Sequence, residues 1–402
     1  MSVRESITVG KTPLPLSRRV RMFGSRRGRV ALFLTGFGAF LNLYAPQPLL
    51  PLFRQMFRAS EFQVSLTISA SVLAVALSAP LVGFLADHFG RKSVILTAMI
   101  GLGLTTAMAA TAQTLPVLIG WRFLQGLFIP GILAVAMAYV SEESPAEAVG
   151  STMATYVTGG VIGGFGGRFL TGLLAGPWGW HAGFLLLGGA TLGSALAVGI
   201  LLPPSRHFVR QRTAFLPMLG KHLRNPQLLA TYAVGFNVLL TIVAAFTYVN
   251  FYLADQPFHL GATALSAVFA VYLVGAAITP TAGRLIDRIG YRRALIGAVG
   301  VSGAGMLLTL IPLLPVIVAG LTLLATGVFA SQAAASTQVG RAARDARSSA
   351  AGLYLTLYYL GGAIGSVVPG LVWSRLGWPG CVAFVLLMQG IMAGIAYTQW
   401  TD

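Results

Sequence analysis

The sequence carries the same short motif twice, GFLADHFGRK at residues 83–92 and GRLIDRIGYRR at residues 283–293. In both copies a glycine (Gly83, Gly283) precedes an aspartate (Asp87, Asp287), and a second glycine (Gly90, Gly290) precedes basic residues. The copies lie 200 residues apart, and each follows a long apolar stretch. The repeat therefore predicts a chain built from two similar halves.

The composition excludes a water-soluble globular protein. Of the 402 residues, 56% are hydrophobic and only 9% are charged, whereas a soluble domain averages about 25% charged residues. The single cysteine, Cys381, excludes a disulfide framework and a cysteine-built metal site. Since the sequence has no cluster of catalytic side chains on facing segments and no nucleotide-binding phosphate loop, we expect neither an enzyme nor an ATP-driven pump, and no cofactor or metal.

Apolar stretches long enough to cross a bilayer fill most of the chain. A spanning helix needs roughly 20 apolar residues. Twelve stretches qualify: 30–53, 62–86, 92–112, 115–140, 147–174, 180–202, 227–253, 263–286, 292–312, 314–338, 348–374 and 379–399. Their continuous apolar runs favour helices over the alternating strands of a barrel. The sequence thus predicts an all-α membrane protein with twelve transmembrane helices in two pseudo-symmetric six-helix bundles.

Basic residues predict the topology. We divide the chain into a basic tail (1–29), an N-terminal bundle (30–202), a linker (203–226) and a C-terminal bundle (227–402). With the N-terminus inside, 22 Lys and Arg residues lie on the cytoplasmic side and 3 on the outer side. We therefore expect a multi-pass protein of the bacterial inner membrane with both termini in the cytoplasm. This topology explains the net charge of +17, so nucleic acid is not an expected partner; we expect a monomer in contact with membrane lipids.

The repeated motif resembles the signature loop of the major facilitator superfamily, and nearly the whole chain outside the tail fits this resemblance. RFLQG, from Arg122 to Gly126, is similar to the arginine motif of the drug:proton antiporter branch. The glycines of span 5 are similar to that branch's glycine motif, although the family's proline is missing. The resemblance implies a secondary transporter of the efflux type, a small-molecule substrate and coupling to protons.

Residues at the cytoplasmic ends of the helices are candidates for gating. We expect Asp87 to meet the positive start of span 11 and Asp287 that of span 5, with the acidic residues after span 4 pairing with arginines of either loop. These contacts would hold the cytoplasmic side closed in the outward-facing state; the alternative is a solvated loop that only sets topology. The gating candidates are Gly83, Asp87, Gly90, Arg91, Glu142, Glu143, Gly283, Asp287, Gly290 and Arg292.

Glycines at every fourth position form one face of span 5, namely Gly159, Gly163 and Gly167. Such a face lets another backbone approach closely. Two interpretations stay open at this point. The face provides plain helix packing, or it makes a sliding contact with a helix of the other half.

The charges placed deep in the spans are arginines, since every acidic residue lies near a span end or in a loop. Arg122 either fixes the bundle through carbonyls and span 1 side chains or faces the central cavity. Arg168 either reaches the outer interface or attracts anions. Glu61, at the outer start of span 2, is the best candidate proton carrier, but Ser60 and Gln63 around it also predict a helix cap.

Pockets for organic ligands are lined mostly by apolar side chains, with a few polar groups that orient the ligand. Polar side chains on both halves are candidates for such a substrate cavity. They are Asn42, Tyr44, Gln47, Arg122, Gln125, Asn237, Thr241, Tyr248, Gln332, Tyr354 and Tyr358. For any single tyrosine, packing or interfacial anchoring is the alternative. We expect proton-coupled export of small amphipathic organic compounds by alternating access. The alternative is an uncoupled or differently coupled carrier of an anionic organic substrate that uses Arg122 and Arg168.

Overall fold

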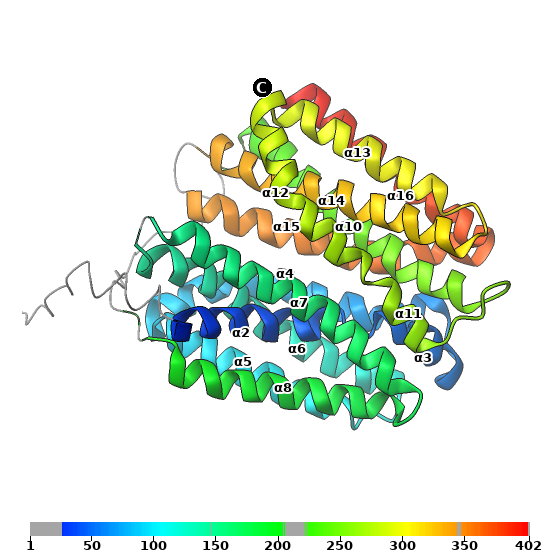
Figure 1. The fold of residues 1–402 in the computed structure, drawn as a ribbon, viewed down its shortest axis with the longest axis horizontal. Helices are drawn as coiled ribbons and strands as arrows, with labels where there is room; N and C mark the ends of the chain where they lie inside the picture. The colour runs from blue at the N-terminus through cyan, green and yellow to red at the C-terminus, as the bar shows by residue number, and fades with distance from the viewer. Residues whose placement is uncertain are drawn as a thin grey trace, which may run out of the picture.

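The computed structural model describes residues 26–145, 147–203, 205, 222, 224–343 and 347–400. Almost all of these residues lie in helices, and the described part contains no strand. The predicted basic tail and the predicted linker fall mostly outside the described residues. Both ends of the described chain lie at the same end of the bundle, toward the left in Figure 1.

The N-terminal half consists of six membrane crossings. The first is broken and comprises α2 (Arg26–Leu43), a short 3-10 helix η1 (Gln47–Leu49) and α3 (Leu50–Met56). The next five are α4 (Glu61–Phe89), α5 (Arg91–Ala109), α6 (Leu115–Glu143), α7 (Val149–Ala175) and α8 (Gly179–Leu201). Pro46, Pro48 and Pro51 accompany the break in the first crossing, because proline cannot donate to an interior helical hydrogen bond.

The C-terminal half repeats this plan with α10 (Pro226–Ala254), α11 (Ala262–Val268), α12 (Val271–Ile289), α13 (Tyr291–Leu308), α14 (Leu314–Ala342), α15 (Arg347–Val367) and α16 (Pro369–Gln399). The short α11 and α12 together form one crossing. Gly377, with φ 57° and ψ −146°, divides α16. The part before it continues α15, and the part from Trp378 onward is the last crossing, with Gly380 against Val372.

Length and apolar composition alone identify ten of the described helices as membrane spans. The two remaining crossings are α7, diluted by glycine and threonine, and α13, which begins with Tyr291, Arg292 and Arg293. Both run beside the others in the bundle (Figure 1). The prediction of a twelve-helix membrane fold in two halves is confirmed. Figure 1 shows these halves as two layers, blue to green below and yellow to red above.

The repeated motif has the same backbone conformation in both halves. Gly90 has φ 86° and ψ 147°, and Gly290 has φ 87° and ψ 157°. Each lies between two long helices, at the end of one and directly before the start of the next. A positive φ of this size favours glycine, because a side chain would collide with the backbone. The second glycine of the motif is therefore required by the turn itself.

The glycine face of α7 packs against α2 of its own half. A Cβ added at Gly159, Gly163 or Gly167 would collide with the backbone carbonyl oxygens of Phe33, Phe37 and Leu41 respectively. The other half repeats this arrangement, because Gly361 and Gly365 of α15 lie equally close to the backbone of α10. The structure therefore places this face within the N-terminal half and not against a helix of the other half.

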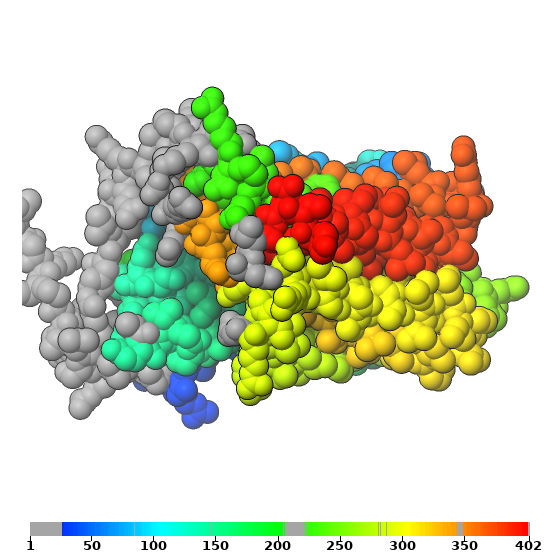
Figure 2. Space-filling view, turned by 90° about the horizontal axis from the view of Figure 1, so that it is seen from above, coloured from blue at the N-terminus to red at the C-terminus, as the bar shows by residue number. Residues whose placement is uncertain are grey.

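Figure 2 looks onto the C-terminal half. There α13 (yellow) and α16 (red) lie side by side and are in contact along the bundle.

The two halves meet mainly along α4 with α15 and α7 with α11. We call the end of the bundle that carries α3 and α11 the Arg54 end, and the end with the two glycine turns the basic end. Among the described residues, contacts between the halves gather toward the Arg54 end: Ser69 Oγ donates to the Ala363 carbonyl (3.0 Å), and Thr263 Oγ1 to that of Gly172 (3.1 Å). At the basic end, a Cβ at Gly83 or Gly352 would meet nothing within 4 Å. The structure is therefore tightly closed at the Arg54 end.

Candidate transport site between the two halves

Arg122 fastens three helices of the N-terminal half together. It lies in α6, is fully buried, and makes four hydrogen bonds. Its Nε donates to the carbonyl of Thr67 on α4 (3.0 Å), and its Nη atoms donate to the carbonyls of Asn42 (2.9 Å) and Leu43 at the end of α2 and to Gln125 Oε1. These acceptors all belong to the N-terminal half. The guanidinium thus caps the carbonyls that the break in the first crossing leaves without helical partners.

Asn42 belongs to the same polar core. Its Nδ2 donates to the Gly38 carbonyl and to Thr191 Oγ1, both at 2.9 Å, and its Oδ1 accepts from Thr106 Oγ1 at 3.0 Å. The side chain joins α2, α5 and α8 and is 1% exposed. The structure therefore places Asn42, Arg122 and Gln125 in the packing of one half.

Arg168 lies between the halves. It sits on α7, is 4% exposed, and donates from Nε to Gln47 Oε1 and from Nη1 to the Gly164 carbonyl, both at 2.7 Å. Gln47 Nε2 in turn donates to Thr247 Oγ1 on α10 at 3.3 Å. The chain of hydrogen bonds from Arg168 through Gln47 therefore crosses from one half to the other.

Aromatic rings from both halves surround Arg168. Its guanidinium carbon lies 5.0 Å from the ring centre of Tyr44 and 4.9 Å from those of Phe269 and Tyr272. Tyr44 follows α2, whereas Phe269 and Tyr272 lie where α11 meets α12. We call Arg168, Tyr44, Phe269 and Tyr272 the Arg168 cage.

The C-terminal half contributes two stacked tyrosines and one amide side chain near the interface between the halves. Tyr354 and Tyr358 stack on α15 with their ring centres 5.9 Å apart. The Tyr354 hydroxyl donates to Gln332 Oε1 on α14 at 3.0 Å, and its ring fits against the bare backbone of Gly235. The predicted residues Gln332, Tyr354 and Tyr358 therefore come together from two helices.

Other predicted residues of α10 lie in packing positions. Tyr248 is fully buried, and its hydroxyl donates to the carbonyls of Ser366 (3.1 Å) and Val367 (3.2 Å). Asn237 Nδ2 and Thr241 Oγ1 donate to carbonyls of the preceding turn of α10. Asn237 Oδ1 has no hydrogen-bond partner in the described part of the chain. Tyr248 thus joins α10 to the end of α15, while Asn237 keeps a free acceptor.

Sequence reasoning did not single out Phe269, Tyr272 or Thr247. Phe269 and Tyr272 are three residues apart, which places two aromatic rings on one face of the crossing, and this spacing was a usable signal. Their approach to Arg168 depends on how the two halves are docked, which no local pattern encodes.

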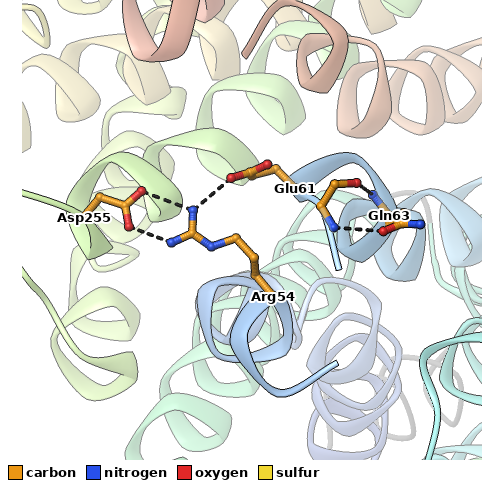
Figure 3. A network of polar contacts seen from close by, with 5 residues as sticks. Arg54, Glu61, Gln63 and Asp255 are labelled. Carbon is orange, nitrogen blue, oxygen red and sulfur yellow. Dashed lines mark hydrogen bonds and ion pairs between the residues drawn. The ribbon is translucent and has the colours of Figure 1, made fainter. Parts of the chain in front are cut away.

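An ion-pair network joins the halves at the Arg54 end (Figure 3). Arg54 on α3 donates from Nη1 and Nη2 to the carboxylate of Asp255, at 3.2 and 2.6 Å, and from Nη1 to Glu61 at 2.9 Å. Asp255 follows α10 in the C-terminal half, and Phe251 on the same helix lies 5.8 Å from the Arg54 guanidinium. One arginine therefore holds a carboxylate from each half.

The start of α4 is capped as the sequence predicts. Ser60 Oγ accepts from the Gln63 amide at 3.2 Å, and Gln63 Oε1 accepts from the Ser60 amide at 2.9 Å (Figure 3). This reciprocal cap leaves the Glu61 carboxylate free to pair with Arg54.

At the basic end, Arg91 of the first motif copy binds two carboxylates of its own half. Arg91 donates to Asp87 at 2.7 Å and to both oxygens of Glu142, at 3.1 and 2.8 Å. Glu143 is 4% exposed and accepts from Ser205 at 3.2 Å. These bonds tie the α4–α5 turn to the end of α6.

The second motif copy is described only in part. Nothing is described of the Asp287 side chain or of the first side chains of α15, so the predicted contacts of Asp87 and Asp287 with helix starts lie outside the described residues. Arg292 lies over the ring of Tyr397 on α16, at 5.2 Å from its centre.

Twelve membrane crossings in two like halves, with polar and aromatic groups of both halves meeting between them, define a membrane transporter rather than an enzyme. The profile of the Major Facilitator Superfamily matches residues 32–366 and 254–400, and the chain belongs to this family.

Named relatives agree with this assignment. The inner membrane transport protein YnfM of Escherichia coli K12 is 33% identical over 366 residues, 90% of this chain and 88% of that protein. The multidrug resistance protein MdtG of Yersinia enterocolitica is 29% identical over 306 residues, 70% of each chain. A crystal structure of a bacterial homologue of the lysosomal transporter Spinster, inward-facing and occupied, shares the fold with a TM-score of 0.76 at 15% identity, over 93% of this chain and 98% of that one.

Proposed function

We propose that this protein is a secondary active transporter of the bacterial inner membrane that exports small amphipathic organic compounds by alternating access. The observation that supports this most directly is the Arg168 cage together with the link from Gln47 to Thr247. Side chains of both halves build one polar and aromatic cluster, so a molecule bound there contacts both halves. The multidrug relative supports an amphipathic substrate.

We place the basic end in the cytoplasm. The lysines and arginines of the predicted loops gather there, and such residues stay on the cytoplasmic side. With this orientation the structure is closed toward the outside. The contacts at the Arg54 end have to break before the site opens outward.

Coupling to protons has a physical route through the Arg54 network. The side chains of Glu61 and Asp255 are 22% and 46% exposed, so protons from the outer side reach them. Protonation of Asp255 removes the charge that binds Arg54 across the halves and thereby weakens the outer closure. The proton gradient would then favour the opening through which substrate leaves the protein.

Transport in proteoliposomes tests this function. We expect labelled chloramphenicol, a neutral amphipathic compound, to move faster with an imposed pH gradient than without one, and Asp255→Asn to lose most of that dependence. Arg375→Gln, which removes an exposed charge at the outer end, is the matched control. Equal movement with and without the gradient would contradict proton coupling, and no movement above protein-free vesicles would contradict export of such compounds.

A further inference from the structure

Arg168 is a buried cation without a counter-ion in the described part of the chain. Its two hydrogen-bond acceptors, Gln47 Oε1 and the Gly164 carbonyl, are neutral. No ion pair involves it, and its Nη2 has no acceptor among the described residues. Since a buried charge is costly unless it is paired, this guanidinium has unused capacity to bind an anion.

A second donor at the same place is also unpaired. The Tyr44 hydroxyl is buried and has no hydrogen-bond partner among the described residues, and the Tyr44 ring lies over the Arg168 guanidinium. The two groups therefore offer a charged N–H and a neutral O–H from neighbouring side chains. This is the donor set that a carboxylate or sulfonate accepts from.

The other deep arginine provides the contrast. Arg122 is also buried, but all four of its hydrogen bonds are to oxygen atoms of the N-terminal half. These bonds indicate that Arg122 stabilises the packing of that half. Arg168 instead faces aromatic rings, and two of those rings belong to the other half. Aromatic faces attract a cation without neutralising it.

We propose that the Arg168 cage is an anion subsite that binds the acidic group of a small aromatic monoanion. The inference rests on the proposed transport function and adds acidic aromatic compounds as one substrate class of the same site. Arg168 Nη2 and the Tyr44 hydroxyl donate to two oxygens of the carboxylate or sulfonate, and the substrate ring packs against Phe269 and Tyr272. When the anion is bound, its charge neutralises that of Arg168. The bound molecule contacts both halves, so binding affects how the two halves pack against each other.

Thermal unfolding of the purified protein tests the subsite. Benzoate and 4-toluenesulfonate should raise the melting temperature, whereas the neutral benzamide and 4-toluenesulfonamide should not, because binding to the native state stabilises it. Arg168→Gln should weaken the apparent affinity for both anions by about tenfold or more, Arg168→Lys should keep part of it, and Arg375→Gln should keep all of it. Equal effects of anions and neutral analogues, or undiminished anion binding by Arg168→Gln, would overturn the subsite.

Tyr44→Phe keeps the test decisive if Arg168→Gln does not fold. It retains the ring and removes the unpaired hydroxyl, so we expect anion binding to weaken several-fold while the melting temperature without ligand is unchanged. Unchanged anion binding would overturn the role of Tyr44 and the geometry of the subsite. Failure of the proposed function is distinguishable: anion-specific stabilisation would persist while neither chloramphenicol nor 4-toluenesulfonate moved into proteoliposomes.

Discussion

Arg54 and Asp255 form a two-pronged ion pair, with Nη1–Oδ2 and Nη2–Oδ1 distances of 3.2 and 2.6 Å, and this pair links the end of the first crossing in one half to the end of α10 in the other. Residues 201 positions apart in the sequence thus close the bundle at one end. The same arginine also binds Glu61, so its removal affects both halves at once.

Breaking this pair should open the Arg54 end. Partly exposed ion pairs contribute up to about 1 kcal/mol, which corresponds to a shift of roughly fivefold in the population of the open state. We expect Asp255→Asn to increase the labelling of a cysteine placed at Ser266 by a maleimide that does not cross membranes, added from the Arg54 side. Ser266 is buried on α11, where it packs against Gly172 of the other half.

A charge swap provides the control for this prediction. The double variant Arg54→Asp with Asp255→Arg should restore part of the closure that each single variant loses. Labelling that is the same in wild type, both single variants and the double variant would show that the pair does not hold the halves together.

Arg122 should matter for stability rather than for selectivity. Replacing it with Gln removes the guanidinium from the buried carbonyls of Asn42, Leu43 and Thr67, and an unpaired buried carbonyl such as that of Leu43 costs about 1–3 kcal/mol. We expect Arg122→Gln to lose its monodisperse peak in size-exclusion chromatography and to melt at a lower temperature, with Arg375→Gln as the control. A stable Arg122→Gln protein with an altered substrate preference would place Arg122 in the substrate site instead.

The glycine face of α7 should tolerate no side chain. Gly163→Val would force α7 away from the Phe37 carbonyl, and overpacking of this kind costs about 1–3 kcal/mol. We expect a lower melting temperature and reduced yield. Gly189→Ala on α8, where a Cβ meets nothing within 4 Å, is the matched control and should behave as wild type. Equal melting temperatures for the two variants would contradict the packing described above.

Asp87→Asn should reduce transport and leave membrane insertion intact. The substitution removes the 2.7 Å ion pair with Arg91, so Arg91 is held less firmly where it binds Glu142 and the contact between the α4–α5 turn and α6 weakens. The protein amount in the membrane and the initial transport rate are measured together. A transport rate equal to that of wild type at equal protein amount would exclude a gating role for Asp87.

The fold was readable from the sequence because two local rules determine it. Apolar length predicts the crossings, and the glycines at 90 and 290 have to adopt positive φ, which places the same turn in each half. The capping box at Ser60 was readable for the same reason, since its partners are three residues apart. Local patterns of this kind do not depend on how the halves meet.

The site was less readable because it depends on docking. The sequence shows that Arg122 and Arg168 are both deep charges, but their different surroundings follow from where α2 ends and which half supplies the neighbouring rings. Likewise, a glycine face predicts a close approach of two helices without identifying the partner, which is α2 in this structure. The Arg54–Asp255 pair joins two loop-proximal residues that no spacing rule connects.

The distance between the halves at both ends of the bundle tests the central claim of alternating access most directly. Spin labels are placed on the exposed pair Gln55 and Ala264 at the Arg54 end and on the exposed pair Ser141 and Gly340 at the basic end, after the buried Cys381 is replaced by Ala. In lipid vesicles with chloramphenicol and an imposed pH gradient, the account predicts that the first distance lengthens while the second shortens. Two distances that stay fixed during transport, or that lengthen together, would contradict it.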